Sequence, residues 1–114
     1  MIAAILETSD PQRLYTGLSL LVSAASDGEP VRILLGFGSL RALAGGFPEP
    51  GADVLAAERE PFTRTLTELW ATARELCEVR ACAAAAQATG VDALPVLSMP
   101  QFVREVGEAR LVVV

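Results

Sequence analysis

The chain has 114 residues, of which 52% are hydrophobic, and it carries a formal net charge of −5. It contains neither histidine nor lysine, which excludes a Ser-His-Asp triad, a Cys-His pair, a Schiff-base lysine and a P-loop lysine. Two cysteines without a histidine cannot complete a tetrahedral zinc site from nitrogen and sulfur ligands. A metal site built from carboxylates alone stays open, but no acidic run has EF-hand spacing. We expect neither a metal nor another cofactor.

The charge pattern and the hydrophobic content bear on partners and location. Nine arginines are spread singly among fourteen acidic residues, so no basic stripe indicates a nucleic-acid surface. No apolar run is long enough to cross a bilayer, and residues 1–7 lack the length and the positive charge of a signal peptide. We therefore expect a cytoplasmic protein with reduced cysteines and with no membrane or nucleic-acid partner. The apolar content is high for one domain over residues 1–114, which favours a homo-oligomer.

The first half of the chain alternates between strand and helix patterns. Residues 1–6 are apolar throughout, as in a strand buried on both faces of a parallel sheet. Residues 8–11 supply N-cap candidates and a proline for a long helix that ends near Gly28. A second strand is predicted over Val31–Leu35, and Ser39 in its exit loop is predicted to cap a short helix.

The second half continues the alternation. From Pro61 onward, apolar residues recur with the 3.6-residue period of a helix, and this stripe is expected to lie in the core. The stripe comprises Phe62, Leu66, Leu69, Trp70, Ala73, Leu76 and Cys77. Ser98 and Gln101 have the spacing of a capping box at the start of a last helix. Residues 110–114 predict a final buried strand.

This alternation is typical of a parallel sheet with helices on both faces and right-handed crossovers. We predict a single α/β domain over residues 1–114, a three-layer sandwich of the doubly wound type with four or five mostly parallel strands. In such sheets ligands bind beyond the carboxyl ends of the strands. The loops at residues 7–11 and 36–39 and the junction at Cys82 are therefore expected to share the functional edge.

Cys82 is the strongest candidate for chemistry at that edge. A short strand over residues 79–81 leads into it, and an alanine-rich helix over residues 83–88 follows it. The positive end of a helix dipole favours the thiolate, which is the form of cysteine that attacks sulfur. A buried cysteine that only packs is the alternative. Arg80 and Glu78 are expected to point to the same side of the strand, with opposite effects on a thiolate.

Residues 79–90 resemble the DsrE/DsrF-like family of small sulfur-relay proteins, in which a strand, a cysteine and an alanine-rich helix ending in glycine follow one another. The order of strands and helices along the whole chain is similar too. The resemblance implies that Cys82 matches the family's persulfide-carrying cysteine. It also implies a cytoplasmic oligomer, often a trimer or hexamer, with sulfur donor and acceptor proteins as partners. One departure is Cys77, which stands before the cysteine strand where the family usually has glycine.

Three hypotheses describe what Cys82 does. In the first, the chain is a sulfur-relay protein, a possible sulfurtransferase, that accepts and passes on a persulfide sulfur through Cys82; this exchange requires no separate base. In the second, it is a non-catalytic oligomeric binding module of the same fold, and the cysteine is buried and structural. In the third, Cys82 senses oxidants as a sulfenic acid. Cys77 is then its only resolving partner, and a disulfide is not expected because Cys77 is predicted to face the core at the far end of the strand.

Overall fold

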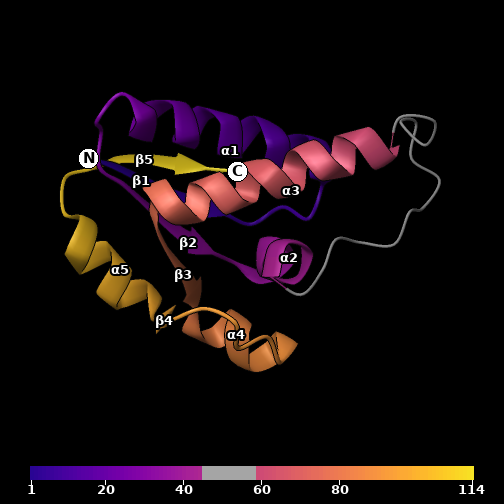
Figure 1. Ribbon diagram of the computed structural model, residues 1–114. Coiled ribbons are helices and arrows are strands. Elements are labelled where there is room, and N and C mark those ends of the chain that lie inside the picture. The colour runs from indigo at the N-terminus through magenta and orange to yellow at the C-terminus, as the bar shows by residue number, and fades with distance from the viewer. Residues whose placement is uncertain (45–58) are drawn as a thin grey trace.

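The apolar strands pair into one sheet in which all strands run in the same direction. The computed structural model describes residues 1–44 and 59–114, with side chains described for residues 1–44 and 65–114. The five strands have the order β4-β3-β2-β1-β5, and every pairing is parallel (Figure 1). The prediction of an α/β fold with a mostly parallel sheet is confirmed. The strands are β1 (Ile2–Leu6), β2 (Val31–Leu35), β3 (Glu78–Cys82), β4 (Val96–Leu97) and β5 (Arg110–Val113).

Local sequence signals determine where the helices begin. The helices are α1 (Pro11–Ser26), α2 (Phe37–Ser39), the π-helical turn η1 (Leu40–Ala44), α3 (Arg59–Leu76), α4 (Ala83–Thr89) and α5 (Met99–Val106). Asp10 caps α1, because its carboxylate accepts a hydrogen bond of 2.9 Å from the N–H of Gln12. The predicted capping box of Ser98 and Gln101 is present at α5. Among the described residues, no helix combines the length and the hydrophobicity that a membrane crossing requires.

One face of the sheet is covered by α1 and α3, which pack against each other (Figure 1). Both helices contribute apolar side chains to the larger hydrophobic cluster, which they form with β1 and β2. Trp70 and Cys77 lie in this cluster, as the helical period predicts. The fully buried side chains of the cluster include Leu6, Leu14, Leu18, Leu21, Ile33, Leu35 and Leu66.

A smaller cluster holds α5 on the sheet. Phe102 of α5 is only 3% exposed and packs with Ala3, Leu34 and Leu97. From β1 to β4 the chain steps across the sheet in one direction, and it returns from β4 to β5 in the other. Ala3 of the smaller cluster and Ala4 of the larger one are successive residues of β1, so the two clusters lie on opposite faces of the sheet.

Two predictions of buried residues were wrong, one in an edge strand and one at the end of a helix. The sequence predicts a buried final strand, but β5 is an edge strand in which Leu111 and Val113 are 60% and 64% exposed. An apolar run in the sequence does not distinguish an edge strand from a central one. Leu76 was also expected in the core stripe, yet it is exposed as the last residue of α3. The side chain of Phe62 lies outside the described residues.

Candidate functional site

Cys82 is both the last residue of β3 and the N-cap residue of α4. Its backbone (φ −59°, ψ 128°) turns the chain from the strand into the helix. The helix is followed by Gly90, whose left-handed conformation (φ 74°) lets its N–H bond the carbonyl of Ala86. The predicted order of strand, cysteine, helix and glycine is therefore present. Because all the strands are parallel, the loops after β1, β2 and β3 share the carboxyl edge of the sheet, as expected.

The thiol of Cys82 is free and partly exposed. Its side chain makes no capping hydrogen bond to α4. It packs against both hydrophobic clusters, and the residue pairs with Leu97 of β4 in the sheet. Cys82 thus lies, partly exposed, at the boundary between the core and the solvent.

A mostly apolar groove runs along α4. Ala83, the residue that follows the cysteine, lines the groove together with Ala86. Leu94 and Val96, from the segment that leads into and forms β4, line it as well. Because alanine side chains are short, an extended segment of another protein can lie close to the start of α4.

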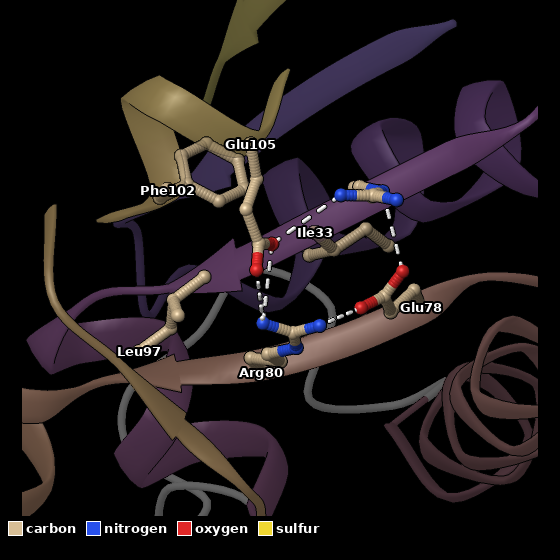
Figure 2. A pocket seen from close by; sticks show the side chains of 7 residues that line it. Ile33, Glu78, Arg80, Leu97, Phe102 and Glu105 are labelled. Carbon is tan, nitrogen blue, oxygen red and sulfur yellow. Dashed lines mark hydrogen bonds and ion pairs between the residues drawn. The ribbon is translucent and has the colours of Figure 1, made fainter. Parts of the chain in front are cut away.

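Four charged side chains from three elements form a closed ring on the sheet near α5 (Figure 2). Arg32 of β2 contacts Glu78 at 3.2 Å and Glu105 of α5 at 3.3 Å. Arg80 of β3 donates to both carboxylate oxygens of Glu105 at 3.1 Å and also bonds Glu78. Each residue contacts two residues of opposite charge, so the ring has no net charge.

The ion pairs of the ring determine which groups the charges of Arg80 and Glu78 interact with. The sequence places both on the same side of the strand as Cys82, and the structure shows that they bind each other and Glu105. The hydrogen bond to Glu105, more than the charge of Glu78, raises the pKa of the Arg80 guanidinium. Arg80 is therefore already paired within the ring. The sequence analysis did not identify Arg32 and Glu105 as partners of Glu78 and Arg80. Only the strand register brings Arg32 opposite Glu78, and only the packing of α5 brings Glu105 to Arg80.

Ser39 joins the exit loops of β1 and β2 rather than capping a helix from outside. It is fully buried, and its hydroxyl donates to the carbonyl of Leu6 and, at 3.4 Å, to that of Gly36. The N-cap residue of this helical segment is Gly36, whose N–H also donates to Leu6 at 2.8 Å. The predicted capping role of Ser39 was therefore wrong. The buried hydroxyl of Ser39 satisfies the backbone carbonyls at the ends of β1 and β2. It thereby holds their exit loops together at the carboxyl edge of the sheet.

Cys77 is a core residue, as predicted, and differs sharply from Cys82. It is buried in the larger cluster, and burial raises the pKa of its thiol. Cys77 directly precedes β3 and Cys82 is its last residue, so the extended strand separates them by roughly 16 Å at about 3.3 Å per residue. A disulfide requires Cα atoms within about 7 Å, so the two cannot bridge within one chain without moving the strand. Over the residues described, no cluster of three or more His, Cys, Asp or Glu side chains could hold a metal ion.

The raised pKa of Cys77 predicts a loss of stability at high pH. Folding favours the neutral thiol, so this contribution is complete below the ordinary pKa of 9.0 and disappears as the pH rises through the folded value. We expect the free energy of unfolding to fall more steeply above that pH in the wild type than in Cys77→Ala. Urea unfolding of both proteins at neutral and at alkaline pH measures the difference. Parallel pH profiles would contradict a role for this thiol.

Comparison with known proteins adds no family assignment. The sequence matches no protein-family model, and no curated protein matches it significantly.

Proposed function

We propose that this chain is a small cytoplasmic sulfur-relay protein that carries a persulfide sulfur on Cys82. The observation that supports the proposal most strongly is the position of a free, partly exposed thiol where β3 passes into α4 at the carboxyl edge of a parallel sheet. The other cysteine, Cys77, is buried, and burial raises the pKa of its thiol, which leaves Cys82 as the thiol for the chemistry. The resemblance to the DsrE/DsrF-like family points to the same residue.

The proposed reaction is a pair of thiol exchanges. The Cys82 thiolate attacks the outer sulfur of a persulfide on a donor protein, so a bond forms to Cys82 Sγ while the donor's S–S bond breaks. The donor leaves as a thiolate and Cys82 becomes a persulfide. An acceptor thiolate then attacks that outer sulfur and releases the Cys82 thiolate. The two steps balance without an external oxidant or reductant, and neither needs a histidine, which the chain lacks.

The groove along α4 suits a partner that delivers sulfur on a flexible segment. Ala83 and Ala86, which follow Cys82 along the chain, line this groove, and most of the lining is apolar. Donor and acceptor proteins are thus the proposed partners, and a homo-oligomer remains the expected state of the chain. Neither nucleic acid nor a membrane is part of the proposal.

The first test is the intact mass of the protein after incubation with a persulfide donor. We expect one added sulfur in the wild type and in Cys77→Ser, and none in Cys82→Ser. The Cys77 variant is the matched control, because it removes the other thiol of the chain. A sulfur gain that persists in Cys82→Ser would reject the proposal.

The second candidate is a non-catalytic oligomeric binding module with a structural cysteine. It is favoured by the packing of Cys82 against both hydrophobic clusters. The same experiment separates the two functions when native alkylation is added. A module of this kind gains no sulfur in the wild type, and its Cys82 reacts with iodoacetamide only after the protein is denatured.

A further inference from the structure

Helix α5 is held on the sheet by two sets of contacts on its inner face. Phe102, the side chain of α5 that is buried, packs in the smaller cluster. Glu105, three residues further along the helix, ion-pairs with Arg32 and Arg80 of the ring. Figure 2 shows Phe102 and Glu105 on α5, with Glu105 directed toward Arg80. A helix held by so few contacts opens locally at a lower free energy than the whole domain unfolds.

The connections of α5 allow it to leave the sheet without disturbing the central strands. Ser98 caps its first turn and directly follows β4, an edge strand of two residues. Gly107 follows its last turn with φ 55°, a conformation that glycine adopts at little cost. The next strand is β5, which forms the other edge. The release of α5 therefore does not require the pairings among β1, β2 and β3 to break.

Cys82 packs against the cluster that α5 completes. It pairs in the sheet with Leu97 of β4, which belongs to that cluster together with Phe102. Leu97 and Phe102 also line the small pocket of the ring. Glu78, Arg80 and Cys82 alternate along β3, so their side chains lie on one face of the strand. The charges that retain α5 and the candidate nucleophile are thus parts of one contiguous packing unit.

We propose that α5 is a strap that limits access to Cys82 and that the ring holds this strap closed. In the closed form Phe102 completes the smaller cluster, and Cys82 is only partly exposed. Release of α5 withdraws Phe102 from the cluster and uncovers the side of Cys82 that packs there. As a control of sulfur transfer this inference rests on the proposed function, because only then does the uncovered thiol meet a sulfur donor.

The ring makes the strap sensitive to ionic strength. Its side chains are 26–40% exposed, so dissolved salt partly screens their attraction. Screening weakens both ion pairs of Glu105, whereas the apolar contact of Phe102 does not depend on charge. Added sodium chloride therefore shifts the population toward the open form.

Native alkylation of the intact chain, resolved by site with mass spectrometry, measures how often the strap opens. When opening and closing are fast, the rate at which iodoacetamide modifies a covered thiol follows the open fraction. We expect Cys82 to react more slowly in the native wild type than in the urea-unfolded chain. We expect a rate about two- to tenfold higher in Glu105→Gln, which loses two ion pairs. Glu108→Gln is the matched control, because it makes the same change of charge just beyond α5 and outside the ring.

Phe102→Leu separates opening of the strap from a direct electrostatic effect. Loss of the Glu105 charge leaves Arg80 less fully paired, and a nearby positive charge by itself favours the Cys82 thiolate. Phe102→Leu loosens the apolar contact without changing any charge, and it should also raise the rate at Cys82. Added sodium chloride should raise the wild-type rate and should have a smaller effect in Glu105→Gln.

Cys77 reports on unfolding of the whole chain in the same samples. It is buried in the larger cluster, on the opposite face of the sheet from the smaller one, so it stays unmodified when only the strap opens. Three results would overturn the proposal. They are a rise in Glu105→Gln without one in Phe102→Leu, equal rises at Cys77 and Cys82, and a native wild-type rate equal to that of the unfolded chain. None of them depends on a sulfur donor, so they are distinct from the failure of the proposed function, which is a sulfur gain that persists in Cys82→Ser.

Discussion

Phe102→Ala is expected to destabilise the protein by about 3–5 kcal/mol, as for a large aromatic side chain removed from a core. Phe102 is the residue of α5 that is buried, and it packs with Ala3, Leu34 and Leu97 to form the smaller cluster. Because that cluster has few members, its neighbours cannot close the cavity that the substitution leaves. The loss is large against the total stability of about 5–15 kcal/mol that is usual for a domain.

Urea unfolding followed by circular dichroism measures this change, and Val103→Ala provides the matched control. Val103 is the next residue of the same helix and is 59% exposed, so its truncation should change the free energy of unfolding by less than about 0.5 kcal/mol. Amide exchange adds a local test, since α5 should lose protection before the central strands do. Equal effects of the two substitutions would show that α5 is not held by Phe102.

Gly38→Ala is expected to cost about 1–3 kcal/mol or more, because the new methyl group meets backbone atoms that cannot move independently. A Cβ at Gly38 would lie 2.5 Å from the carbonyl oxygen of Glu7 and 3.0 Å from the nitrogen of Ser9. The loops after β1 and β2 would have to separate to admit it. That movement would also disturb the hydrogen bonds that Ser39 makes to the strand ends.

Gly36→Ala is the comparison that isolates the backbone clash. A Cβ at Gly36 would come within 1.9 Å of a carboxylate oxygen of Glu7, but that oxygen is the far end of a flexible side chain and can rotate away. We therefore expect a smaller loss of stability in Gly36→Ala than in Gly38→Ala, measured by thermal unfolding of both. The reverse order would show that the two loops are free to separate.

Much of the fold was accessible from the sequence, because local signals specify the elements. The uniformly apolar run of β1, the Asp10 cap and the capping box at Ser98 each predict an element that the structure contains. Local sequence signals do not specify the order of the strands in the sheet. Without that order the central β1 and the edge strand β5 look alike, and the burial of Leu111 and Val113 was overestimated for this reason.

Some features of the candidate site were likewise predictable from local sequence, whereas others depend on residues far apart in the chain. The place of Cys82 between strand and helix follows from the residues on either side of it, and the structure contains it there. Its packing against both clusters depends on residues distant in the sequence. The charge ring depends on such residues too, since Glu105 reaches Arg80 only after α5 has crossed the sheet. The buried position of Ser39 depends likewise on the close approach of two loops.

The ring of Arg32, Glu78, Arg80 and Glu105 also has a consequence for the path of folding. It joins segments separated by 73 positions along the chain. Contacts between such distant segments are costly to form early, because a long loop must close before they yield any stabilisation. We therefore expect the ring to form only after β2 and β3 are aligned, so that its contacts belong to the native state more than to the folding nucleus. Interactions of that kind slow unfolding rather than speed folding, so we expect the four charges mainly to retain α5 on the folded sheet.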